Sequence, residues 1–126
     1  MKRSVCCILI FLELFFLTGC KSADVKKVEK SINGIGLVSV EKEEKIISAR
    51  SVFELLSEED KAQVDNIADL AAAESRLRVC KAEQAIDQIG DISELTYGDR
   101  DLVAEAQSIY TELNMDEQEQ VHNSDI

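Results

Sequence analysis

The chain has 126 residues, of which 45% are hydrophobic and 31% charged, with 5 glycines and no proline. Its 14 basic and 25 acidic residues give a formal net charge of −11, which argues against a nucleic-acid partner because phosphate binding needs a cationic face. The hydrophobic fraction is typical of a folded chain and too high for a disordered acidic tail. Because the residues that usually interrupt an all-β chain are scarce, the composition favours an all-α fold.

The N-terminus has the layout of an export signal. Two basic residues precede an apolar run over residues 5–17, and the sequence LTGC follows at positions 17–20. This ending resembles the bacterial lipobox, whose cysteine becomes the first residue of the mature protein and is acylated on its sulfur. We therefore expect a lipoprotein signal peptide at 1–19, cleavage between Gly19 and Cys20, and lipidation of Cys20. Two acyl chains of the palmitate type would attach the protein stably to membrane lipid, where a single chain would be marginal.

An alternative interpretation of the apolar run is a transmembrane anchor. The run is shorter than the roughly 20 residues that a helix needs to span a bilayer. Glu13 departs from the usual signal pattern because a carboxylate costs insertion energy, although its neighbours on both sides remain strongly apolar. The lipoprotein interpretation places the mature chain at the extracytoplasmic face of the cell membrane.

The cysteines have separate fates under this interpretation. Cys6 and Cys7 leave with the signal, Cys20 carries lipid and Cys80 remains alone. The mature chain is therefore expected to have neither an intramolecular disulfide nor a metal site built from clustered cysteines.

The mature chain contains an internal repeat. Residues 25–36 match residues 79–90, and residues 46–66 match residues 103–123. Within each run the apolar residues recur at intervals of three and four, which is typical of a helix with one buried face. The matched pairs are Val25/Val79, Val28/Ala82, Ile32/Ile86, Ile35/Ile89, Gly36/Gly90, Ile46/Val103, Ala49/Ala106, Val52/Ile109, Phe53/Tyr110, Leu56/Leu113, Val64/Val121 and Asn66/Asn123.

The middle of the chain predicts one long helix over residues 67–89. Two apolar stripes follow each other there without a turn signal between them, and the step from Cys80 to Ala82 rotates about 200° around a helix axis. The second stripe therefore faces nearly opposite to the first. The stripes are Ile67, Leu70, Ala73, Leu77 and Cys80, then Val79, Ala82, Ile86 and Ile89.

This pattern predicts a three-helix bundle that shares its last helix with an incomplete second helical bundle. The expected divisions are a lipidated N-terminus and short tether at 20–24, a first three-helix repeat at 25–78, a second, truncated repeat at 79–123 and a tail at 124–126.

The expected helix ends carry suitable chemistry. Gly36 and Gly90 follow apolar stripes, where a left-handed residue commonly ends a helix. Two residue pairs resemble capping boxes that open further short helices. These pairs are Ser57 with Asp60, and Asn114 with Glu117.

The first copy resembles a three-helix repeat that is common in cell-surface proteins of Gram-positive bacteria. The motif residues are Ile32, Ile35, Gly36, Val38, Ile46, Ala49, Arg50, Phe53, Leu56, Lys61, Val64, Asn66, Leu70, Ala73, Glu74 and Leu77. The second copy has Gln107 in place of the arginine and Gln118 in place of the lysine, and it stops before a third helix. The resemblance implies a spacer or interaction module without catalysis.

The truncated second copy leaves two alternatives. Its two helices close on one another or fold loosely, as terminal half-repeats do when they cap an array. Otherwise a protein partner, or a second copy of the chain, supplies the missing helix.

No residue set predicts catalysis, a metal ion or a cofactor. The single histidine, His122, lies in an expected frayed terminus that cannot hold a catalytic base in place. Cys80 lies on an apolar stripe, which predicts a buried small hydrophobe rather than a nucleophile. The acidic runs lack the spacing of a helix–loop–helix calcium loop, and no glycine-rich phosphate loop is present.

The expected function is a non-catalytic, lipid-anchored surface module that acts as a spacer or protein-docking element. The alternative is a ligand-binding or accessory lipoprotein subunit that uses the uncovered groove of the second repeat. Four lysines close to the lipid, against an acidic C-terminal part, suggest a basic foot on anionic headgroups, with ordinary solubility charge as the alternative. These are Lys21, Lys26, Lys27 and Lys30.

Overall fold

The computed structural model describes residues 20–124 and confirms the all-α class, with no strand in this part of the chain. The predicted signal peptide at 1–19 lies outside the described residues. The helices are α1 (Ala23–Asn33), α2 (Glu43–Glu54), α3 (Glu58–Lys61), α4 (Ile67–Ile89), α5 (Arg100–Glu112) and α6 (Met115–Gln118). Three 3-10 turns connect them: η1 (Val40–Lys42), η2 (Ile92–Glu94) and η3 (Tyr97–Asp99).

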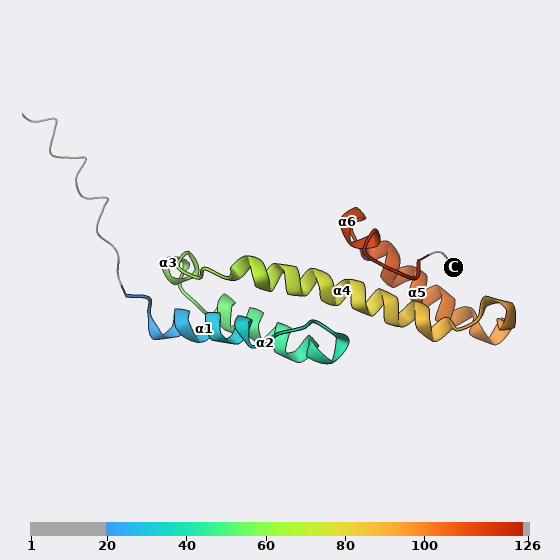
Figure 1. Ribbon diagram of the computed structural model, residues 1–126, viewed down its shortest axis with the longest axis horizontal. Helices are drawn as coiled ribbons and strands as arrows, with labels where there is room; N and C mark the ends of the chain where they lie inside the picture. The colour runs from blue at the N-terminus through green and yellow to red at the C-terminus, as the bar shows by residue number, and fades with distance from the viewer. Residues whose placement is uncertain (1–19, 125–126) are drawn as a thin grey trace, which may run out of the picture.

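Helix α4 is the spine of an elongated molecule (Figure 1). It has 23 residues, or about 34 Å at 1.5 Å per residue. Helices α1 and α2 pack along its N-terminal half, α5 packs along its C-terminal half and α6 lies against its middle. The single helix predicted over residues 67–89 is confirmed.

The buried residues form two clusters on opposite sides of α4. The first contains Val25, Val28, Ile32, Ile35, Ile46, Ala49, Val64, Leu70, Ala73 and Leu77. The second contains Val79, Ala82, Ile86, Ala106, Leu113 and Val121. Each predicted stripe of α4 therefore contributes to a different core, as its rotation about the helix axis requires.

The helix ends agree only partly with the prediction. Asn114 and Glu117 form the reciprocal capping box that opens α6, whereas Ser57 caps α3 in one direction only, by accepting from the Asp60 amide at 3.1 Å. Gly90 follows α4 with φ +74° and ψ −145°, an extended conformation that glycine alone adopts readily, rather than the predicted left-handed cap.

The other glycine prediction also needs a correction. Helix α1 ends at Asn33 and is capped by Gly34, which has an ordinary helical φ of −76°. Gly36 has φ +66° but lies beyond this cap, in the connection to η1. Its positive φ therefore turns the loop and does not terminate the helix.

The C-terminal segment is held in place, so the expected fraying at His122 is wrong. The His122 amide donates to Glu83 Oε1 at 3.4 Å, and Asn123 Nδ2 donates to the Glu83 carbonyl at 3.2 Å. Both acceptors belong to α4. The segment is fixed because its own polar groups close it onto the long helix.

Cys80 is half-buried rather than fully buried, and its Sγ lies 4.0 Å from the Val38 carbonyl oxygen. Its sulfur reaches the loop before α2 because Cys80 sits at the point where the two stripes of α4 cross over. No helix in the described part of the chain is long and apolar enough to cross a membrane.

Candidate functional site

The second repeat contains an open apolar groove between α4, α5 and the loop after α4. Its volume is about 430 Å³. The apolar wall consists of Ile86, Ile89, Ile92, Leu95, Val103, Ala106 and Tyr110, with polar groups from Gln107, Asn123 and Ser124. Ile92, on η2, remains 51% exposed.

Comparison with the first repeat explains why the groove is open. Ile46 is 2% exposed in the first repeat, and its counterpart Val103 is 38% exposed. In the same way, Ile35 is buried while its counterpart Ile89 is only half-buried. The residues that are more exposed in the second repeat therefore lie on the side that the third helix covers in the first repeat.

The N-terminal half of α4 occupies the equivalent place in the first repeat. Its residues Leu70, Ala73 and Leu77 complete the first core. Beside them, Glu74 accepts hydrogen bonds from Arg50 Nε at 2.7 Å and Arg50 Nη2 at 2.6 Å. This two-point ion pair fixes the rotation of the helix on α2.

Within residues 79–124, the part of the second repeat that is described, no ion pair corresponds to this one. Gln107 stands at the position of Arg50 and lines the groove. An amide can donate or accept a hydrogen bond but does not compensate a buried carboxylate. The groove therefore favours a polar group other than a carboxylate beside Gln107, whereas the first repeat places the Glu74 carboxylate beside Arg50.

Each repeat contains an asparagine whose side chain donates hydrogen bonds to the first helix of that repeat, and we call it an asparagine clamp. The matching clamps show that the two repeats fold alike as far as Asn66 and Asn123. Asn66 Nδ2 donates to the Glu29 carbonyl and to Asn33 Oδ1, each at 3.0 Å. Its counterpart Asn123 donates to the Glu83 carbonyl and to Asp87 Oδ1, at the corresponding positions of α4.

The backbone next to each clamp is bonded in the same way. The Asp65 amide donates to Glu29 Oε1 at 3.0 Å, just as the His122 amide donates to Glu83. Asn66 leads directly into α4, whereas Asn123 lies on the rim of the groove. The internal repeat therefore extends to individual hydrogen bonds.

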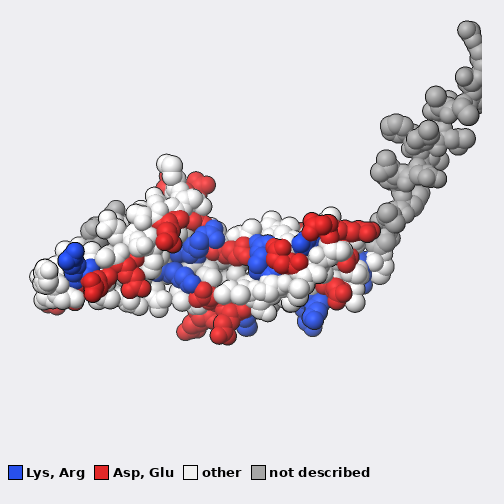
Figure 2. All heavy atoms as spheres, turned by 180° about the vertical axis from the view of Figure 1, so that it is seen from behind, with Lys and Arg blue, Asp and Glu red and all other residues white. Residues whose placement is uncertain are grey.

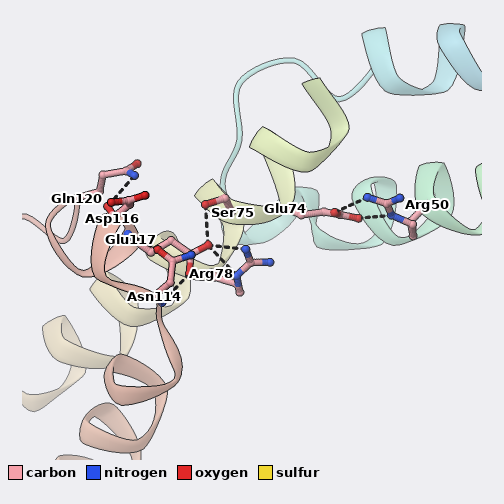
Figure 3. A network of polar contacts seen from close by, with 8 residues as sticks. All are labelled: Arg50, Glu74, Ser75, Arg78, Asn114, Asp116, Glu117 and Gln120. Carbon is pink, nitrogen blue, oxygen red and sulfur yellow. Dashed lines mark hydrogen bonds and ion pairs between the residues drawn. The ribbon is translucent and has the colours of Figure 1, made fainter. Parts of the chain in front are cut away.

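A buried carboxylate ties α6 to the middle of α4 (Figure 3). The Glu117 side chain is 3% exposed, and its Oε1 accepts from Ser75 Oγ at 2.7 Å and from Arg78 Nε at 3.0 Å. Its Oε2 accepts from the Asn114 amide at 3.2 Å. Hydrogen bonding to Arg78, helped by Ser75 and Asn114, outweighs desolvation and lowers the pKa of Glu117 to about 2. This network holds α6 on α4.

The groove lies in a strongly acidic part of the chain. Residues 82–124 contain eleven Asp and Glu residues and a single cation, Arg100. Around the first repeat and the centre of α4, by contrast, acidic and basic side chains alternate on the face shown in Figure 2. The groove is thus a patch of apolar surface within a negative field.

Cys20 is exposed at the other end of the molecule, just before α1, with Lys26 Nζ 3.7 Å from its sulfur. Lys21 pairs with Glu29 and Asp65, and these hydrogen bonds raise its pKa. Lys21 therefore ties the N-terminal segment to the first repeat. The other three lysines of the expected basic foot are exposed, and they have no carboxylate partner in the part of the chain that is described.

The candidate chemical residues are not brought together. The His122 side chain is exposed, and Cys80 lies on α4 in the middle of the molecule. The cations nearest Cys80 in sequence are paired with carboxylates: Arg76 with Glu83, Arg78 with Glu117 and Lys81 with Glu43. Among residues 20–124, no group of three His, Cys, Asp or Glu side chains is arranged to hold a metal ion.

No protein-family model, curated protein or solved structure matches this chain. The site therefore has to be interpreted from its own geometry.

Two features of the site were not predicted from sequence. One is the Glu117 network, whose partners Ser75 and Arg78 lie about forty residues away. The other is the contribution of Ile92 and Leu95 to the groove wall. The connection between the matched runs is residues 37–45 in the first copy and the longer segment 91–102 in the second. This extra length was a signal for the groove wall, because additional apolar loop residues need a surface to pack on.

Proposed function

We propose that the mature chain is a non-catalytic, lipid-anchored surface module that carries a docking groove on a rigid helical stalk. The observation that carries this proposal is the placement of its two distinctive features. Cys20 lies just before α1, and residues of α5 line the groove. Helices α1 and α5 lie toward opposite ends of the molecule (Figure 1). Helix α4 runs between them without a break.

The lipobox-like sequence before Cys20 supports attachment at that end, and the exposure of Cys20 is compatible with acylation. The resemblance of the first copy to Gram-positive surface repeats supports a place in the cell envelope. A tether as short as residues 20–22 would keep the first repeat close to the lipid and hold the groove tens of ångströms away, given the length of α4.

Metabolic labelling with a fatty acid tests the attachment. Wild-type protein should be processed and labelled, and Cys20→Ala should leave an unlabelled, uncleaved precursor. Cys80→Ala is the matched control and should keep both label and processing. Normal processing of Cys20→Ala would overturn the proposed anchor.

A small-ligand-binding subunit is the second candidate, because the groove volume of about 430 Å³ falls within the roughly 300–1,000 Å³ of ligand pockets. An apolar envelope component that binds there should raise the melting temperature of the wild-type chain and leave that of Val103→Asp unchanged. If the chain is instead a spacer or a protein-docking module, an apolar envelope component should not change its melting temperature.

A further inference from the structure

We propose that the groove of the second repeat receives an amphipathic helix of a partner protein, with apolar residues in the register of Leu70, Ala73 and Leu77, an uncharged polar side chain where α4 has Glu74, and basic flanks. This inference deepens the docking part of the proposed function and does not depend on lipid attachment. It rests on the first repeat, which shows what covers the equivalent surface.

The shape of the occupant follows from the internal repeat. The groove-lining Ile89, Val103 and Tyr110 correspond to Ile35, Ile46 and Phe53, all of which belong to the first core or pack against it. There the cover is a helix that begins at the asparagine clamp and runs antiparallel to α2. A helix that occupies the groove would begin near Asn123 and run antiparallel to α5.

The polar residue of the occupant follows from Gln107. Arg50 holds Glu74 at two points in the first repeat, but Gln107 offers no positive charge. A glutamate brought against Gln107 would lose water without gaining a counter-charge. A glutamine in its place can exchange two hydrogen bonds with Gln107, because each amide carries a donor and an acceptor.

The charge of the occupant follows from the eleven acidic residues and one arginine of residues 82–124. Asp87, Asp101 and Glu105 all lie on the two helices that form the groove. Basic residues beside the apolar stripe would complement this field and accelerate docking. A second copy of this chain would instead bring an equally acidic surface against it, which disfavours a symmetric dimer.

Synthetic helices based on residues 66–80 of the chain, with Cys80→Ala to prevent oxidation, provide the test. The basic amide peptide carries Glu74→Gln together with Asp69→Lys and Ala71→Lys, two positions beside the apolar stripe. The basic acid peptide retains Glu74 and has the same lysines. A third peptide carries Glu74→Gln without the lysines. Binding to the full-length chain in detergent is measured by fluorescence anisotropy, with labelled peptides.

We expect the basic amide peptide to bind at least tenfold more tightly than each of the other two. Added salt should weaken its binding, because part of the attraction is electrostatic. The variant Gln107→Arg should reverse the preference toward the peptide that retains Glu74, since it restores the ion pair of the first repeat.

Two further variants locate the site. Val103→Asp, in the groove wall, should reduce binding at least tenfold. Ile47→Asp is its control, because Ile47 is a 55% exposed apolar residue on α2, and it should leave binding unchanged. Circular dichroism verifies that both variants keep their helices.

Equal affinity for the three peptides, equal loss in both aspartate variants or the absence of saturable binding would overturn the inference. So would a dimer of the chain that excludes the peptides. The proposed anchor is judged separately: an unlabelled Cys20→Ala chain that still binds the basic amide peptide supports both proposals, and failure of either measurement does not decide the other.

Discussion

The two repeats present nearly the same apolar pattern to different surroundings. In the first, α4 covers α1 and α2, and Ile46 is buried; in the second, no helix among residues 20–124 covers α4 and α5 on the corresponding side, and Val103 is exposed. The clamps at Asn66 and Asn123 show that both repeats are otherwise built alike. The difference teaches that the groove lies where the first repeat has its covering helix and does not come from a different kind of fold.

The largest expected difference between the two repeats is in the free energy of unfolding that each loses when apolar volume is removed from it. Leu70 is completely buried in the first core, so Leu70→Ala should lower the free energy of unfolding by about 2–5 kcal/mol. Val103→Ala, in the open groove, should cost less than about 1 kcal/mol because solvent already reaches that side chain. Urea denaturation measures both, and equal losses would show that the groove is closed in solution.

The second test concerns the Glu117 network that holds α6 on α4. Glu117→Gln should cost on the order of 2 kcal/mol at neutral pH, after allowing for solvent around the half-exposed Arg78. Asp60→Asn, at the equivalent position of the first repeat, should change stability by about 0.5 kcal/mol or less. Urea midpoints of the two variants compare the positions directly.

The pH dependence of the Glu117 effect has a defined sign. The pKa of Glu117 is lowered from 4.5 to about 2 in the folded chain, so its unfolded state binds the proton more readily. Its contribution is complete above about pH 5 and is lost as the pH falls toward 2. The stability gap between wild type and Glu117→Gln should therefore shrink over this range, and a constant gap would contradict the assignment.

The third test concerns backbone strain at the two glycines that have positive φ, one in each repeat. Gly36 and Gly90 both have positive φ, and a Cβ at either position would meet no atom within 4 Å. Substitution by alanine should therefore cost about 1 kcal/mol at Gly36 and about 2 kcal/mol at Gly90, whose extended conformation with positive φ is essentially restricted to glycine. Gly98→Ala is the control, with an expected change within about 0.5 kcal/mol, and thermal unfolding measures all three.

The smallest expected effect concerns the clamp at the rim of the groove. Asn123→Ala removes two hydrogen bonds to α4 and should weaken local protection there by about 1 kcal/mol. Hydrogen exchange should show faster exchange of the backbone amide of His122, with the first core unchanged. Asn66→Ala should instead affect the whole first repeat, because Asn66 leads into α4. Identical exchange patterns in the two variants would argue against separate clamps.

Local signals in the sequence were sufficient to predict much of the fold. The two stripes of α4, rotated by about 200°, predicted one continuous helix with two buried faces. The pair Asn114 and Glu117 predicted the capping box that opens α6. Both features depend on residues within one or two turns of each other, which is the range over which sequence spacing fixes geometry.

Features that depend on contacts between distant segments were not predicted. The sequence places Glu117 in a capping box, but its burial against Arg78 requires α6 to fold back on α4. The terminus was expected to fray because nothing near His122 indicates that Glu83 holds it. The groove itself was anticipated as an uncovered surface, whereas its wall from η2 depends on how the longer loop packs.

The sharing of α4 also affects how the protein unfolds. Opposite faces of one helix serve two cores, and residues such as Leu77 and Val79 belong to different cores although they are two positions apart. If α4 unwinds at one core, residues near Leu77 and Val79 also lose their contacts with the other core. The stalk should therefore melt as one cooperative unit, and a helix bound in the groove would raise the thermal stability of the repeat that it never touches.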